Sequence, residues 1–147
     1  MPKIIASDST YLNHSIVKVW EVISDFNSYK KWWPAVVNLE VLNTSPQIIG
    51  STLVAKPFNG RSFSIKAVEA KPFSEIKLKY FAGIYSGDGR WIFESVNDKT
   101  KLTYEVNLII TDKFTKVIAW IVPVSKIHSL IFKKIFRSLE KYLEELK

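Results

Sequence analysis

The side chains able to carry out chemistry in this 147-residue chain are few, and most of them are aromatic. Histidine occurs only twice, as His14 and His128, and cysteine does not occur. The absence of cysteine excludes a thiol nucleophile, a disulfide scaffold and a cysteine metal site. Two histidines are too few for a multi-histidine metal centre. We therefore predict neither a metal site nor a cofactor.

His128 is the first candidate for a polar contact with a ligand. It lies near the centre of an apolar arc in the last segment, where its imidazole could hydrogen-bond a carbonyl or hydroxyl group or transfer a proton. The alternative, which we favour, is a core histidine satisfied by a tyrosine or a backbone carbonyl. Asp25 could act as an acid or a base, but its position before Asn27 favours a helix N-cap.

Aromatic residues supply the larger candidate set, with five Trp, six Tyr and nine Phe in the chain. Strand alternation puts several of them on one face of a sheet, as plain core or as the lining of a pocket that the core leaves unfilled. A buried tyrosine hydroxyl needs a hydrogen-bond partner, and a ligand can supply it. The predicted ligand-binding residues are Tyr80, Tyr85, Trp91, Phe93, Tyr104, Leu108, Trp120, His128 and Phe132.

Catalytic motifs are missing from the sequence. There is no nucleophile elbow, no HExxH motif, no phosphate-binding loop and no pair of carboxylates at adjacent inward positions. Gly87-Asp88-Gly89 is a turn signal, and it is not a nucleotide-binding fingerprint, since one strand and no helix follow it. The sequence therefore predicts no catalytic residue and favours a binding protein over an enzyme.

A fold must position these side chains, and the hydropathy pattern predicts one that combines helices with a β-sheet. Residues 3–12 are expected to form a strand, residues 15–24 a helix, and residues 27–33 a second short helix that Pro34 ends. From residue 36 to 112 apolar and polar residues alternate between short connections. This pattern indicates an antiparallel meander with one buried face.

The last segment, residues 125–147, is expected to form a long helix. Its apolar residues cover about half of the circumference, which is wider than a simple amphipathic stripe, so the helix needs a concave partner such as a curved sheet. Residues 113–122 carry a shorter apolar pattern, which predicts a short helix or an ordered loop. The apolar arc of the long helix consists of Ile127, His128, Ile131, Phe132, Ile135, Phe136, Leu139, Tyr142, Leu143 and Leu146.

Several stretches of the sequence match the pattern of a known group of proteins. Residues 19–34 contain VWEVISDFNSY followed by WWP, residues 87–94 read GDGRWIFE, and residues 101–106 read KLTYEV. Together with the long terminal helix, they resemble the START/Bet v 1-like (SRPBCC) superfamily. The closest resemblance is to its polyketide cyclase/dehydrase and lipid-transport group, which includes coenzyme Q-binding proteins. The resemblance covers essentially the whole chain, so we expect one domain over residues 1–147.

The resemblance implies an α+β helix-grip fold. In this fold a seven-stranded antiparallel sheet curls around a long C-terminal helix, two short helices lie between strands 1 and 2, and an apolar cavity separates sheet and helix. The implied function is the binding of a hydrophobic small molecule, such as a lipid, an isoprenoid quinone or a polyketide-like compound, by a carrier or sensor. The alternatives are a cyclase/dehydrase- or hydrolase-type enzyme acting on such a molecule, and a protein-interaction module that uses a basic surface.

The net charge of the chain indicates which kinds of partner it could bind. The chain carries a net charge of +7, and residues 113–137 hold six basic residues and no acidic one. Such a segment is most often the solvated face of a helix, but with Trp120 it could also make transient contact with an anionic membrane. We expect no nucleic-acid partner and a monomer or weak dimer. A cytoplasmic location is expected because no signal peptide or membrane-spanning stretch is visible.

Overall fold

The structure is a computed structural model that describes residues 3–58 and 60–146. In chain order the elements are β1 (Lys3–Leu12), α1 (Ile16–Ile23), a 3₁₀ helix (Phe26–Ser28), α2 (Tyr29–Trp32), β2 (Val37–Asn43), β3 (Thr52–Pro57), β4 (Phe63–Lys71), β5 (Glu75–Phe81), β6 (Tyr85–Val96), β7 (Lys99–Ile110), α3 (Lys113–Ile121) and α4 (Val124–Glu145).

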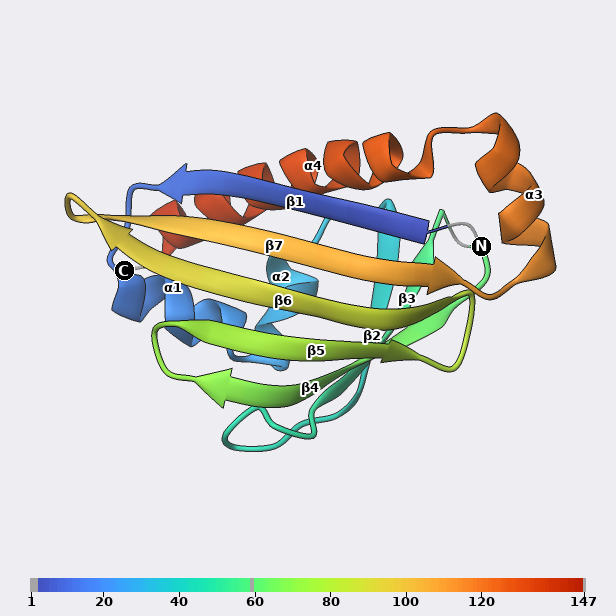
Figure 1. Cartoon of the computed structure of the whole chain (residues 1–147). Coiled ribbons are helices and arrows are strands. Elements are labelled where there is room, and N and C mark those ends of the chain that lie inside the picture. The colour runs from blue at the N-terminus through green and yellow to red at the C-terminus, as the bar shows by residue number, and fades with distance from the viewer. Residues whose placement is uncertain (1–2, 59, 147) are drawn as a thin grey trace.

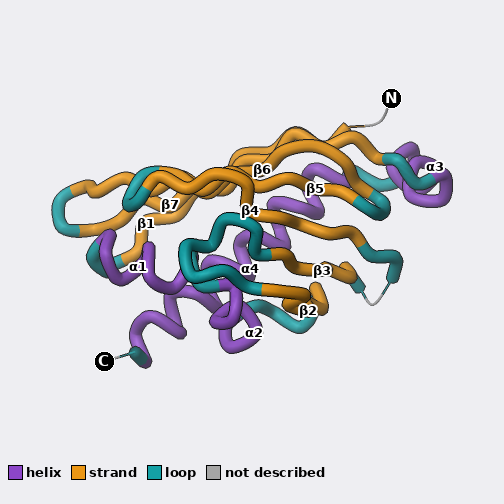
Figure 2. The backbone as a smooth tube through the Cα atoms, turned by 90° about the horizontal axis from the view of Figure 1, so that it is seen from below, coloured by secondary structure: helices purple, strands orange, loops and turns teal. Residues whose placement is uncertain are grey.

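The seven strands form one antiparallel sheet in the order β1-β7-β6-β5-β4-β3-β2. The sheet curls around α4, and α1 lies at the opposite end of the sheet from α3 (Figure 1). The view from below shows α4 crossing the hollow side of the sheet (Figure 2). This architecture confirms the predicted α+β helix-grip fold, with two short helices between β1 and β2.

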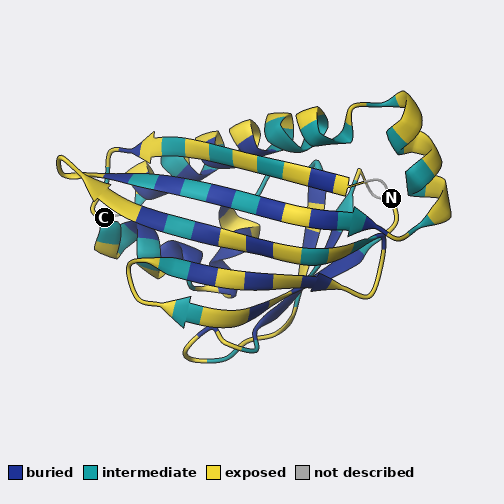
Figure 3. Cartoon of the chain, in the orientation of Figure 1, coloured by how far each residue is buried: buried dark blue, intermediate teal, exposed yellow. Residues whose placement is uncertain are grey.

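Burial follows the alternating sequence along the strands (Figure 3). In β7 every second residue from Thr100 to Ile110 is buried, and the residues between them are half-buried or exposed. The inward side chains of the sheet pack against one face of α4. The buried residues of α4 are Phe132, Ile135, Phe136, Leu139 and Leu143.

Side-chain caps start the helices that follow β1. Ser15 Oγ accepts a hydrogen bond from the backbone N–H of Lys18 at 3.3 Å, and Asp25 Oδ1 accepts one from the backbone N–H of Asn27 at 3.0 Å. The second contact confirms that Asp25 is an N-cap, here for the 3₁₀ helix. Caps of this kind satisfy backbone donors that the helix leaves unpaired.

Gly87-Asp88-Gly89, although a turn signal in the sequence, does not turn the chain: these residues lie inside β6 and pair with both β5 and β7. The glycines are needed because neighbouring atoms come close. A Cβ at Gly87 would collide with the carbonyl oxygen of Asn107, and one at Gly89 would lie 3.0 Å from the hydroxyl of Tyr104.

The segment after β7 forms α3, as expected for residues 113–122. Asp112 caps it, because Oδ2 accepts a hydrogen bond from the backbone N–H of Thr115 at 2.8 Å. No residue of α3 is buried, and the helix projects beyond the end of the sheet (Figure 1). In the described part of the chain no single helix is long and apolar enough to cross a membrane. Helices α3 and α4 pass that test only as a pair, by length and composition, and the pair is bent by 92°.

Candidate ligand-binding cavity

A cavity of about 520 Å³ lies between the concave side of the sheet and the first half of α4. Its walls come from α2, β1 to β7 and α4. Phe58, in the β3–β4 connection, and Phe114, in α3, line its open side and are themselves exposed. The cavity therefore opens at the end of the molecule where α3 lies.

Seven of the nine residues predicted to bind a ligand line this cavity. They are Tyr80, Tyr85, Trp91, Tyr104, Leu108, His128 and Phe132. The other two, Phe93 and Trp120, are not brought to its lining. Phe93 is buried at the far end of β6, where it packs against Trp20 of α1 with ring centroids 5.0 Å apart. Trp120 is 85% exposed, because α3 leaves its apolar residues in solvent.

The lining also contains residues that the sequence analysis did not single out. The alternation of apolar residues in β2, β3 and β4 was visible in the sequence. Only the order of the strands shows that these residues share one cavity with β5 to β7. They include Leu39, Ala55, Phe63 and Ile65 of these strands, and Tyr29 and Trp33 of the α2 region also line the cavity.

Two tyrosine hydroxyls meet on the sheet wall of the cavity. Tyr80 of β5 and Tyr104 of β7 are buried and hydrogen-bond to one another across β6. Gly89 of β6 leaves the space that the pair occupies, because a Cβ there would lie 2.9 Å from Tyr80 Cε1. Burial raises the pKa of both tyrosines, so each keeps its O–H at neutral pH.

An aromatic cluster connects this pair to α4. Phe132 stacks on Tyr104 with ring centroids 4.4 Å apart, and Trp91 meets the same tyrosine edge-on at 4.5 Å. Aromatic pairs in these arrangements contribute about 0.5–1.5 kcal/mol each beyond the burial of their area. The cluster therefore holds the Tyr104 ring in one orientation.

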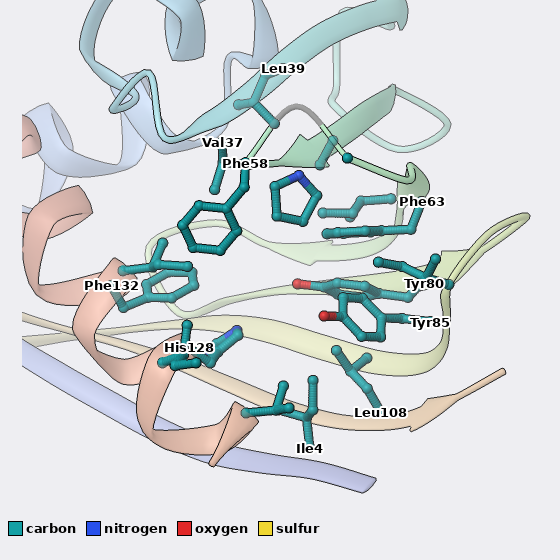
Figure 4. A pocket seen from close by; sticks show the side chains of 18 of the residues that line it. Ile4, Val37, Leu39, Phe58, Phe63, Tyr80, Tyr85, Leu108, His128 and Phe132 are labelled. Atoms are coloured by element: carbon teal, nitrogen blue, oxygen red, sulfur yellow. The ribbon is translucent and has the colours of Figure 1, made fainter. Parts of the chain in front are cut away.

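His128 reaches the cavity from the helix side. Figure 4 shows its ring and the hydroxyl groups of Tyr80 and Tyr85 pointing into the cavity from opposite sides. Burial lowers the pKa of His128 to about 4, although the carboxylate of Asp8 acts in the opposite direction. The imidazole is therefore neutral at physiological pH.

The surroundings of His128 differ from the role that the sequence favoured. Its Nδ1 lies 3.9 Å from Asp8 Oδ2, and both atoms are buried without a hydrogen-bond partner among the described residues. The expectation of a histidine satisfied by a tyrosine or a backbone carbonyl is thus wrong for Nδ1. Asp8 was not predicted as a site residue, although the two-residue period from Ile4 to Leu12 in β1 indicated its inward position.

The remainder of the lining is almost entirely apolar. Among the described residues that line the cavity, Arg61 is the one that carries a charge at neutral pH, and it lies at the open side. None of the described lining residues is an aspartate or a glutamate. The cavity is therefore suited to an uncharged, hydrophobic molecule.

A curved antiparallel sheet that grips a C-terminal helix over an apolar cavity defines the START-like class of helix-grip domains. The sequence model of the family described as polyketide cyclase / dehydrase and lipid transport matches residues 12–137, and the chain belongs to this family. No curated protein is similar enough in sequence to count as a match.

Solved structures agree with this classification at the level of the fold. A START superfamily protein from Mycobacterium smegmatis has a TM-score of 0.75 and 17% identity, with 97% of this chain and 99% of that chain covered. The Aha1 dimer from Colwellia psychrerythraea has a TM-score of 0.66 and 18% identity, with 100% and 99% covered. DynU16, a protein from the dynemicin biosynthetic locus, has a TM-score of 0.61 and 16% identity, and the match covers 99% of this chain and 48% of that one.

Proposed function

We propose that this protein binds a hydrophobic small molecule in the cavity between the sheet and α4, as a carrier or a sensor. A lipid, an isoprenoid quinone or a polyketide-like compound would fit this description. The observation that carries the proposal is the cavity of about 520 Å³ with its apolar lining. Sites for small organic ligands typically measure about 300–1,000 Å³ and are lined mainly by hydrophobic and aromatic side chains. The alternative of a protein-interaction module would need no such cavity.

Native mass spectrometry of the purified protein, followed by organic extraction, tests the proposal. We expect a mass shift from a co-purified compound, or from an added hydrophobic compound, and the extracted molecule then identifies the ligand class. A clean mass with no shift on titration of hydrophobic compounds would contradict the proposal and favour a macromolecular partner.

One observation favours a second candidate, a cyclase/dehydrase- or hydrolase-type enzyme. His128 is neutral, lines the cavity and lies close to the half-buried carboxylate of Asp8, so it could take a proton from a bound substrate. The extracted compound separates the two candidates. Incubation with the protein should leave a carried molecule chemically unchanged. A new product that the His128→Gln variant fails to form would favour the enzyme.

We further propose that the protein collects its ligand at the surface of an anionic membrane, through α3. Phe114, Val117, Ile118 and Ile121 recur at helical spacing and are all exposed, and Phe114 and Ile118 also line the cavity. An apolar helix at the mouth would let a hydrophobic molecule pass from the bilayer without crossing water. Trp120 adds an amphipathic ring of the kind that is favoured at a membrane interface.

Charge supports the choice of an anionic surface. Lys113 and Lys116 lie on α3 itself, and the whole chain carries a net charge of +7. Basic residues beside an apolar face gain about 1 kcal/mol each near anionic lipid, and salt screens this attraction. Contact with phosphatidylcholine alone should therefore be weaker than contact with a membrane that contains phosphatidylglycerol.

Co-sedimentation with vesicles tests the membrane proposal. We expect the protein to pellet with vesicles containing phosphatidylglycerol, and the Trp120→Asp variant to pellet several-fold less. Tyr11→Asp is the matched control, because Tyr11 is 61% exposed and lies on β1 at the end of the sheet remote from α3. Equal binding of both variants, or no binding to either kind of vesicle, would contradict the proposal.

A further inference from the structure

Three polar side chains from three different elements converge within the apolar cavity, and a fourth lies behind one of them. Tyr80 comes from β5, Tyr104 from β7 and His128 from α4, and all three line the cavity. Asp8 of β1 pairs in register with Tyr104 and faces His128 without lining the cavity itself. The rings of Tyr104 and His128 are stacked with centroids 6.4 Å apart. A polar group of a ligand that reaches this place would meet the tyrosines and the histidine together.

The two tyrosines leave one hydrogen-bond donor available. Each hydroxyl carries one hydrogen, and in the bond between Tyr80 and Tyr104 one of the two hydrogens is used. The second hydrogen has no acceptor among the described residues. A buried O–H group without an acceptor costs free energy, so the pair favours a ligand that offers an oxygen lone pair.

His128 and Asp8 together leave one acceptor available. A neutral imidazole carries a hydrogen on one nitrogen and a lone pair on the other. With the hydrogen on Nδ1, the N–H points to Oδ2 of Asp8, 3.9 Å away, and a small approach of the two groups satisfies both buried atoms. Nε2 of His128 then carries the lone pair and accepts a hydrogen bond. The tautomer follows from the position of the carboxylate, as it does where a carboxylate orients a catalytic or metal-bound histidine.

We propose that the bound molecule carries a hydroxyl group, as an alcohol or a phenol, which accepts a hydrogen bond from the Tyr80–Tyr104 pair and donates one to His128. This inference rests on the proposed binding of a hydrophobic molecule in the cavity and specifies its chemistry. Asp8 acts through His128 and is a positioning residue. The ligand is then a largely apolar molecule with its hydroxyl group at the centre of the domain.

Other polar groups fit these partners less well. A ketone or ether oxygen accepts from the tyrosine pair but has no hydrogen for His128. An ammonium group donates but cannot accept the tyrosine hydrogen. A carboxylate would bring a second negative charge towards Asp8, and the cationic lining residue Arg61 lies at the open side. A hydroxyl group both accepts and donates, so it satisfies both sides.

The strand between the tyrosines provides independent support. Gly89 lies within β6, where a side chain would lie 2.9 Å from Tyr80 Cε1 and 3.0 Å from the Tyr104 hydroxyl. A glycine inside a strand weakens the sheet unless a close approach requires it. Here the close approach is that of the two tyrosines, so β6 is built to accommodate the polar pair.

Three probes that differ at one group test the inference: para-butylphenol, para-butylanisole and butylbenzene. The phenol can donate and accept, the anisole can only accept, and butylbenzene can do neither. Their affinities are measured by displacement of the uncharged fluorescent dye N-phenyl-1-naphthylamine and by calorimetry. We expect the phenol to bind about tenfold more tightly than butylbenzene, with the anisole between them, since the phenol gains a hydrogen bond from each of the two partners and the anisole from one.

Amino-acid substitutions then show which residues cause the preference for the phenol over butylbenzene. Tyr104→Phe and His128→Phe should each reduce the ratio of phenol to butylbenzene affinity several-fold, with the affinity for butylbenzene retained. Tyr142→Phe is the matched control, because it also removes a tyrosine hydroxyl but from a part of α4 that does not line the cavity, and it should keep the ratio. Asp8→Ala should lower the ratio, and Asp8→Asn should restore it, because an amide oxygen still accepts from Nδ1. Thermal unfolding shows that each variant is folded.

The outcomes separate this inference from the proposed function. Equal affinity for all three probes would overturn the hydroxyl assignment and leave a hydrophobic binding protein. A ratio that falls equally in Tyr142→Phe and Tyr104→Phe would overturn the assignment to the Tyr80–Tyr104 pair. Failure of the dye, the phenol and butylbenzene alike to bind would contradict the proposed function and, with it, the inference.

Discussion

Arg61 donates a hydrogen bond from Nη1 to Oδ1 of Asp112 at 2.5 Å, and this contact joins the β3–β4 connection to the start of α3. The Arg61 guanidinium also lies over the ring of Phe114, 5.3 Å from its centroid. Asp112 uses its other oxygen to cap α3 through Thr115. Two sides of the cavity mouth are thus linked by an exposed ion pair, and Arg61 and Phe114 both line the cavity.

Arg61→Ala should speed the exchange of ligand more than it lowers stability. An exposed ion pair contributes little to stability, so the free energy of unfolding should hardly change. Dissociation of the dye, followed by stopped-flow fluorescence, should become several-fold faster because α3 loses its contact with the β3–β4 connection. The matched control is Arg90→Ala, which removes an exposed pair with Glu105 on the outer face of the sheet. Equal dissociation rates in the two variants would show that the Arg61–Asp112 pair does not restrain the mouth.

Ala55→Phe should close the cavity and abolish binding. Ala55 is buried on β3 and lines the cavity, so a phenyl group there occupies part of the volume of about 520 Å³. We expect dye affinity to fall by at least tenfold, while stability changes by about 1–3 kcal/mol in either direction, since the ring fills empty space but can strain its neighbours. Val68→Phe adds the same ring at an exposed position of β4 and should bind the dye normally. Unchanged dye binding by a folded Ala55→Phe variant would place the dye elsewhere on the molecule.

Most of the fold could be predicted because its signals are local. The alternation along β7 and the apolar arc of α4 each depend on residues a few positions apart, and both match the observed burial. The arc is not covered evenly, however. Ile135, Leu139 and Leu143 are fully buried, whereas Ile127 and His128 are half-buried because the cavity lies beneath them. The width of the arc indicated a concave partner, but not where that partner leaves a gap.

The site was less predictable because its contacts join distant parts of the chain. Asp8 and His128 come from opposite ends of the sequence, and only the pairing of β1 with β7 and the packing of α4 bring them together. The role of Gly89 also depends on distant residues. Its sequence neighbours indicate only a turn signal, and the need for a glycine inside β6 becomes clear once Tyr80 and Tyr104 are located beside it. For Trp120 the sequence predicts a contact that the fold does not make. An aromatic residue on an apolar helix is expected at the pocket, but Trp120 is exposed.

Asp25→Ala should reduce stability and leave ligand binding intact. Asp25 Oδ1 accepts the backbone N–H of Asn27 at 3.0 Å, and its side chain does not line the cavity. Loss of a capping side chain costs about 1 kcal/mol, with a range of 0.5–2. Asp25→Asn, which keeps a capping oxygen, should recover most of this loss in a urea unfolding experiment. Normal stability combined with lost dye binding would instead assign Asp25 to the binding site.

His128 should make the protein less stable in acid. Burial lowers its pKa from the ordinary value of 6.5 to about 4, so between these two values the unfolded chain binds a proton that folded His128 does not. Stability therefore falls as the pH decreases through this window, and this residue accounts for at most about 3 kcal/mol of the loss.

Carboxylates titrate in the same range, so the contribution of His128 is the difference between the unaltered protein and His128→Gln in urea unfolding at a series of pH values. The His128→Gln curve should be flatter between pH 6.5 and 4, and the control Leu130→Gln, at an exposed position of the same helix, should keep the original slope. Parallel curves for the unaltered protein and His128→Gln would mean that folding does not lower the pKa of His128, and would contradict a buried imidazole in the cavity wall.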